Sequence, residues 1–269
     1  MNIKSSANYL NNYNYPDMNF EDLIKKLRTS ILICFGMLLY NMSNCQTDKL
    51  YPPFTKWYQD PLGFKPLELS TAFGFAWGST AVAACLILTK NDSAFQKRVS
   101  LYQEAGYGFG YKSPYTVVFQ NDIGIMYSVR KWMTMGLGWN SFHFKDKTNN
   151  TWSFGIRPFV RWYPYKSKRI ALYFEYGAGI SYSLKRFPLT GNGWKSDTSR
   201  TGTRFNLTSK YGIGTEIHFN NRLSLQSGVK HFHLSNGNIA GIERNPSHDS
   251  NGFFIGLMYN LNNNNQTKL

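Results

Sequence analysis

From Leu101 onward, the chain alternates between apolar positions and polar or glycine positions in one segment after another. A period of two is typical of β-strands, whose successive side chains point to opposite faces. In the run 170–182, for example, every second residue is apolar or aromatic. The pattern predicts eight strands, within 101–111, 117–129, 133–140, 152–162, 170–182, 205–218 and 223–235 and in the run that ends at 261.

The two faces of these strands indicate where the core lies. One face is apolar, and the other carries glycines together with charged residues, which are too polar for the dry core of a soluble barrel but suit a small lumen of paired charges. Strands of this length also favour a tilted transmembrane barrel over a sandwich. The sequence therefore predicts an all-β fold, an eight-stranded antiparallel transmembrane β-barrel over 101–262, with a bulge at Pro158. The predicted luminal charges are Glu104, Asp122, Arg157, Arg161, Glu175, Lys210, Glu216 and Lys230.

The amino terminus has the parts of a secretory signal peptide. Lys25, Lys26 and Arg28 precede a short apolar run over 31–40, and small polar residues lead to Cys45. We expect residues 1–45 to be the signal, with cleavage after Cys45. A lipoprotein acylated on Cys45 is the competing interpretation, and both interpretations export the chain.

A lead-in over residues 46–100 precedes the predicted barrel, and a polar tail over 263–269 follows it. The lead-in contains the run 72–88, seventeen residues without a charge, which is the lower limit for a helix that spans a membrane. We expect a short helix packed on the barrel or its rim. A membrane span is the alternative.

Charge and composition narrow the class of partner. A net charge of +15 suits a ligand rich in phosphate. Nucleic acid would satisfy the same charge, but the sequence has no helix-turn-helix pattern, zinc-ligand spacing or phosphate-binding loop, so we expect no nucleic-acid partner. No cofactor or metal is expected.

The predicted strand over 223–235 carries a candidate general base and a candidate nucleophile. His233 and Ser235 share a strand face, with Cα atoms about 6.5 to 7 Å apart. Short turns at one end of the barrel and long loops at the other place this pair at the outer end, on the lipid-facing side. Asn236 and Gly237 follow and offer N–H donors for an oxyanion. This arrangement predicts acyl transfer, with Glu243, Asp249 or Asn251 available to orient the histidine.

The run His-Leu-Ser-Asn at 233–236, followed by Asn-Pro-Ser-His-Asp-Ser-Asn-Gly at 245–252, resembles the carboxy-terminal signature of the lipid A 3-O-deacylases, the PagL family. The resemblance implies a bacterial outer-membrane esterase that removes an acyl chain from the lipid A of lipopolysaccharide. It also implies a Glu after the loop proline, where the nearest residue by spacing is Asn251. We favour Asp249 as the carboxylate, with Glu243 second and Asn251 as a neutral alternative.

The sequence leaves several assignments open. The rival hypothesis is a non-enzymatic small outer-membrane barrel with a structural or adhesion role, and monomer and homodimer are equally compatible with the sequence. His231 is interpreted as a ring at the membrane interface and His248 as a solvated loop residue. His143 and His218 are expected near strand ends or in the lumen.

Overall fold

The computed structural model describes residues 72–89, 98–110, 116–145, 150–188, 201–241 and 244–261. The predicted signal peptide, most of the lead-in and the polar tail lie outside the described residues. The described residues form a barrel and one helix that precedes it in the chain.

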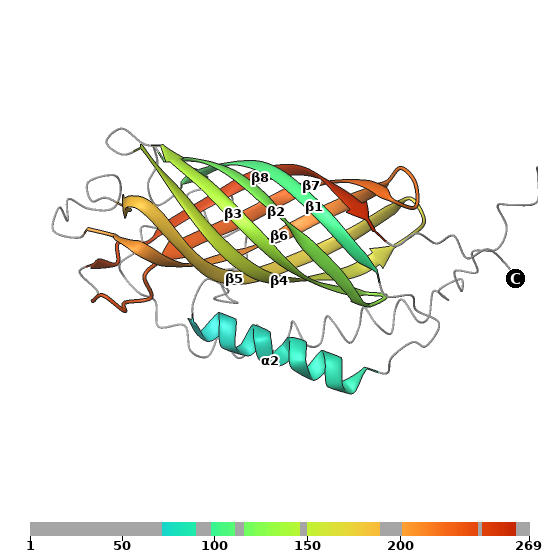
Figure 1. Cartoon of the computed structure of the whole chain (residues 1–269). Helices are drawn as coiled ribbons and strands as arrows, with labels where there is room; N and C mark the ends of the chain where they lie inside the picture. The colour runs from blue at the N-terminus through green and yellow to red at the C-terminus, as the bar shows by residue number, and fades with distance from the viewer. Residues whose placement is uncertain are drawn as a thin grey trace, which may run out of the picture. The chain divides into compact units, whose positions relative to one another are not determined.

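Eight antiparallel strands form a closed barrel in which each strand pairs with its neighbours in sequence and β8 pairs with β1, as predicted. The strands run tilted across the barrel wall (Figure 1). Closure leaves no strand edge unpaired, which is the condition for a sheet to cross a membrane. The strands are β1 (Val99–Gly110), β2 (Val117–Arg130), β3 (Met133–Lys145), β4 (Asn150–Lys166), β5 (Ile170–Phe187), β6 (Thr203–His218), β7 (Leu223–Ser235) and β8 (His248–Asn260).

The apolar run of the lead-in forms a helix, α2 (Ala72–Leu88), with the predicted bounds. Near its end, the Leu86 carbonyl accepts a hydrogen bond of 3.3 Å from Arg130 Nη2, at the end of β2. Within the part of the chain that the structure describes, no helix combines the length and the apolar character needed to cross a membrane.

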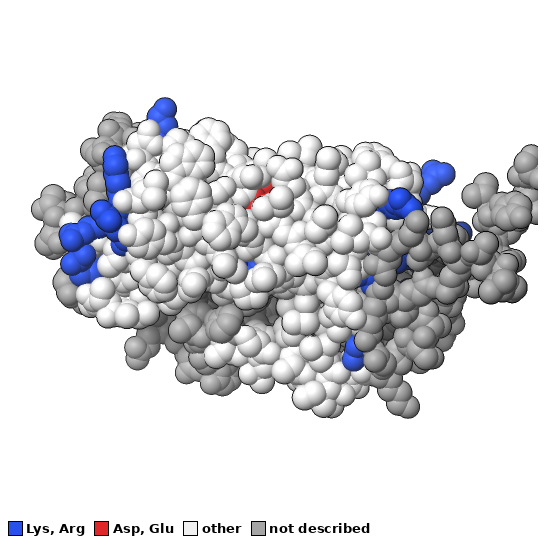
Figure 2. All heavy atoms as spheres, in the orientation of Figure 1, with Lys and Arg blue, Asp and Glu red and all other residues white. Residues whose placement is uncertain are grey.

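The outer wall of the barrel is apolar. Its exposed and half-buried side chains are mostly large aliphatic and aromatic residues, among them Leu101, Ile123, Leu137, Ile156, Ile180, Ile213, Val229 and Ile255. On the face that Figure 2 shows, lysine and arginine gather at the two ends of the barrel, and the band between them is almost free of charge. A closed barrel with an apolar outside and polar ends is built to span a hydrocarbon layer.

The inner wall carries the predicted charges. Four basic residues (Arg157, Arg161, Lys210 and Lys230) and four acidic residues (Glu104, Asp122, Glu175 and Glu216) all point inward and are at most 2% exposed. Lys230 Nζ lies 2.6 Å and Lys210 Nζ 2.8 Å from Glu104 Oε1, and Arg161 Nε lies 2.7 Å from Glu175 Oε2. The lumen is therefore a neutral ion-pair network and not an open channel.

An apolar cluster also fills the lumen, toward the end that carries the longer loops. It consists of Val118, Phe142, Phe144, Phe187, Phe232 and Leu234. His248 packs against this cluster: it is fully buried, and its ring lies 5.5 Å from that of Phe144. The interpretation of His248 as a solvated loop residue was wrong, because β8 begins at His248 and turns its side chain inward.

The predicted bulge at Pro158 was also wrong. Pro158 lies opposite Leu137 without a shift in the register of β3 and β4. Between β4 and β5 the register is the same before and after Pro158, and it shifts only between Trp162 and Tyr165. The proline ring points outward, and the strand accommodates the missing N–H without an extra residue.

Loop lengths differ between the two ends, as the sequence indicated. The connections at 131–132, 167–169 and 219–222 are short, whereas those at 188–202 and 236–247 are long. The connection at 146–149, which was expected among the longer ones, is no longer than the one at 219–222. The long connections join strand ends on the same side of the barrel, and β7 ends there with Ser235.

Candidate functional site

The β7–β8 hairpin brings the predicted site residues together on the outer wall. Along β7, Lys230, Phe232 and Leu234 point into the barrel, so His231, His233 and Ser235 point outward. The register of the hairpin places His233 opposite Asp249 and His231 opposite Asn251. Residues directly opposite each other on one face have Cβ atoms about 4.5–5.5 Å apart, within reach of a side-chain hydrogen bond.

His233 and Asp249 are in direct contact. Nδ1 of His233 lies 2.7 Å from Oδ1 of Asp249, the distance of a charge-assisted hydrogen bond. The side chain of Asp249 is 2% exposed and that of His233 is 14% exposed. With Nδ1–H donated to the carboxylate, the proton-accepting nitrogen of the ring is Nε2. This is the tautomer that a general base requires.

Ser235 lies two residues beyond His233 on the same face, at the end of β7. Its Oγ accepts a hydrogen bond of 3.3 Å from the N–H of Gly237. Both side chains are described, and no hydrogen bond joins Ser235 Oγ to His233 in this structure. Hydrogen bonds between a nucleophile and its base are often formed only when substrate is bound.

The two predicted oxyanion donors, Asn236 and Gly237, make different contacts in the loop after Ser235. Asn236 is 3% exposed and is committed to the loop: its Nδ2 donates to the Arg244 carbonyl at 2.6 Å, and its N–H donates to Asn245 Oδ1 at 3.0 Å. Gly237 has φ +61°, a conformation that L side chains rarely adopt. Its N–H donates to the Ser235 hydroxyl oxygen, so Gly237 is the predicted donor that remains in contact with Ser235.

The three candidates for the orienting residue have different positions. Asp249 contacts His233 through its carboxylate. Asn251 lies opposite His231, and its Oδ1 is 2.9 Å from Nδ1 of that ring. Glu243 lies outside the described residues.

Reasoning from the sequence did not anticipate the position of His231. This side chain was interpreted as an interfacial ring, yet it is fully buried, with Nε2 at 3.2 Å from Asp249 Oδ1. The alternation of β7 already placed His231 beside His233. The signal that was lacking was the β7–β8 register, which puts a carboxylate within reach of both rings.

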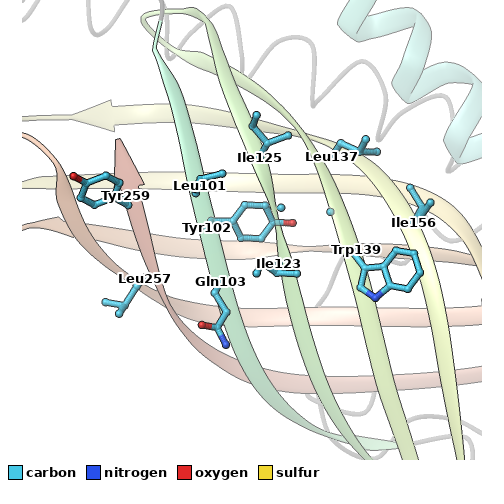
Figure 3. Close-up of a pocket in the computed structure, with 12 residues that line it drawn as sticks. Leu101, Tyr102, Gln103, Ile123, Ile125, Leu137, Trp139, Ile156, Leu257 and Tyr259 are labelled. Carbon is cyan, nitrogen blue, oxygen red and sulfur yellow. The ribbon is translucent and has the colours of Figure 1, made fainter. Parts of the chain in front are cut away.

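A second surface feature lies away from the contact between His233 and Asp249. Figure 3 shows an apolar groove on the outer wall over β1, β2 and β3, with Tyr102 beneath it. None of its lining residues is a histidine, serine, aspartate or glutamate, so it contains no acid–base pair. The lining includes Leu101, Ile123, Ile125, Leu137, Trp139 and Leu257. Among the described residues there is also no cluster of histidine, cysteine and carboxylate side chains suited to a metal ion.

Comparisons with solved structures return small outer-membrane barrels. The crystal structure of the outer membrane enzyme PagL is 17% identical, with a TM-score of 0.43, and the match covers 58% of this chain and 97% of that one. Neisserial surface protein A is 11% identical, with a TM-score of 0.41 and coverage of 61% and 96%. Ail of Yersinia pestis is 9% identical, with a TM-score of 0.36 and coverage of 61% and 97%. A search of curated protein sequences found no match.

The comparison with protein families is more specific than the comparison of folds. A family model described as lipid A 3-O-deacylase (PagL) matches residues 125–258. The matched segment contains His231, His233, Ser235 and Asp249, and hence both strands of the hairpin that carries the site. The chain belongs to the lipid A 3-O-deacylase (PagL) family.

Proposed function

We propose that the protein is a serine esterase that hydrolyses an ester-linked acyl chain of lipid A, with Ser235 as nucleophile, His233 as general base and Asp249 as the carboxylate that orients the histidine. The observation that carries this proposal is the contact of 2.7 Å between His233 Nδ1 and Asp249 Oδ1, on the outer wall beside Ser235. Each of these residue types has a defined part in acyl transfer.

The location of the site supports a lipid substrate. The protein is a barrel of the bacterial outer membrane, and the site lies on its outward face at the end with the long loops. Lipopolysaccharide forms the outer leaflet of that membrane, so its esters lie beside such a site. The family description points to the acyl chain on the oxygen of position 3.

In the first half of the reaction, Ser235 Oγ attacks the ester carbonyl carbon while His233 Nε2 takes the hydroxyl proton. The carbonyl oxygen becomes an oxyanion, which accepts a hydrogen bond from the N–H of Gly237 in place of Ser235 Oγ. A donor in this position contributes about 2.7 to 4 kcal/mol to the stability of the transition state. Asp249 stabilises the imidazolium that forms. When the intermediate collapses, the bond from carbonyl carbon to sugar oxygen breaks, and His233 returns the proton to that oxygen.

In the second half, water replaces the sugar hydroxyl. His233 Nε2 takes a proton from the water, whose oxygen attacks the carbonyl carbon of the acyl-enzyme. The bond to Ser235 Oγ then breaks, and His233 gives its proton back to the serine. The products are lipid A with one free hydroxyl and one free fatty acid, and the enzyme is restored without a cofactor.

The test compares two serines of the same strand face. Ser235→Ala and Ser227→Ala are expressed with wild type, and the lipid A of each strain is analysed by mass spectrometry. We expect wild type and Ser227→Ala to release one acyl chain and Ser235→Ala to release none, with all three barrels keeping heat-modifiable gel mobility. Full activity of Ser235→Ala would refute the proposed nucleophile. Lipid A that is identical with and without the wild-type protein would favour the structural or adhesion role.

A further inference from the structure

His231 is buried where an outward-facing side chain should be exposed. It points away from the lumen, yet its exposed fraction is zero. The neighbours of the ring include Asn251 Oδ1 at 2.9 Å from Nδ1, Asp249 Oδ1 at 3.2 Å from Nε2, and the Tyr211 ring at 4.8 Å between centroids. Tyr211 comes from β6, and Asp249 and Asn251 come from β8, so the ring is enclosed from both sides.

The same oxygen of Asp249 therefore lies between two imidazoles, His233 at 2.7 Å and His231 at 3.2 Å. A neutral His231 with its proton on Nδ1 would set a bare Nε2 against a carboxylate oxygen, and two acceptors would then face each other. Two arrangements avoid this. Either the ring carries both protons, or the Asn251 amide is turned so that its NH₂ donates to Nδ1. In both arrangements, Nε2 carries a proton and faces Asp249 Oδ1 at 3.2 Å, a contact at ion-pair distance that lacks hydrogen-bond geometry in this structure.

We propose that His231 is a positioning residue for the esterase reaction: with Asn251 behind it, it fixes the side chain of Asp249 so that the carboxylate stays directed at His233. The inference rests on the proposed function, because it assigns His231 a role only through Asp249. His231 does not touch the substrate, since it is fully buried. Its effect should therefore appear in kcat and not in KM.

This role explains why a second ionisable ring is buried on a wall that faces lipid. Asp249 is 2% exposed, so water does not hold its carboxylate in place. Besides its contact with His233, the carboxylate meets the Nε2 of His231 at the same oxygen, and this second contact limits rotation about its χ angles. Limiting that rotation keeps Nε2 of His233 aligned toward Ser235. Misplacing a catalytic group by about 1 Å can cost about 10²-fold in rate.

The experiment measures kcat and KM on purified lipopolysaccharide in detergent micelles for the full chain. His231→Phe keeps a ring but removes both nitrogens, and His231→Gln restores a donor at the position of Nε2. We expect His231→Phe to lower kcat by about 10- to 100-fold with KM within about twofold, and His231→Gln to stay within about threefold of wild type. The matched control is His143→Phe. His143 also lies on the outer wall and contacts an asparagine, Asn150, at 2.5 Å, but on β3.

Asn251→Leu completes the test. Because Asn251 acts through His231, the double variant with His231→Phe should be no slower than His231→Phe alone. The inference is overturned if His231→Phe keeps the wild-type kcat, or if His231→Gln is as slow as His231→Phe while both fold as well as the control. If His231→Phe does not fold, a wild-type kcat for Asn251→Leu overturns it instead. Activity of Ser235→Ala would refute the proposed function itself, so the two failures are distinguishable.

Discussion

Replacing Asp249 with Asn should remove the charge that stabilises the His233 imidazolium and leave the shape of the site intact. The contact of 2.7 Å between Nδ1 and Oδ1 puts the centres of the two charges about 4 Å apart. At an effective dielectric constant of about 20, two unit charges at this separation interact by about 4 kcal/mol. Since about 1.36 kcal/mol corresponds to a tenfold change in rate, we expect kcat to fall by about 10³-fold.

The assay is single-turnover release of fatty acid from lipopolysaccharide, measured over an incubation long enough to detect a rate about 10⁴-fold below wild type. Asp249→Glu is the matched variant, because it keeps the charge and lengthens the side chain by one methylene. We expect it to be faster than Asp249→Asn. Heat-modifiable mobility on gels checks that each barrel is folded. If Asp249→Asn stays within about threefold of wild type while Ser235→Ala is inactive, Asp249 has no part in the reaction and the reasoning from the 2.7 Å contact fails.

Two further variants test the loop and the lumen. Gly237→Ala should lower kcat by about tenfold without unfolding the barrel, because φ +61° is strained for alanine and the shifted N–H no longer meets the oxyanion; unchanged single-turnover rates would contradict this. Glu104→Ala should destabilise the barrel by about 3 to 5 kcal/mol, because it leaves Lys210 and Lys230 without their shared carboxylate. Urea unfolding in micelles measures this, with Gln103→Ala as the outward-facing control, and a loss equal to the control would contradict it.

The barrel and its two faces were predictable from the sequence because strand alternation is a local property. Each of the eight luminal charges was assigned to the inside by its parity along a strand, and all eight are buried there. The same parity placed His233 and Ser235 on the outside. Pro158 shows the limit of local rules, since the general expectation of a bulge at a proline in mid-strand did not hold there.

The partners of the site residues were not predictable in this way because they depend on register. A twelve-residue connection, 236–247, joins β7 to β8, and a slip of two residues would keep every parity while pairing His233 with another β8 residue. Asp249, Glu243 and Asn251 therefore stayed as alternatives, although Asp249 was favoured. His248 was misassigned for a related reason, because the sequence does not reveal at which residue the loop ends. His248 was taken as a loop residue, whereas it is the first residue of β8.

The burial of the site follows a gradient that suits a reaction at a lipid surface. His231 and Asp249 are hidden almost completely, His233 is 14% exposed, and Ser235 is also partly exposed at the strand end. A carboxylate that faced hydrocarbon directly would be costly, and the contacts of Asp249 Oδ1 with two imidazoles offset part of that cost. The proposed nucleophile is thus accessible from the membrane, and the residues proposed to orient its base are not. A luminal site could not work in this way, because the ion pairs and the cluster around Phe144 already fill the barrel.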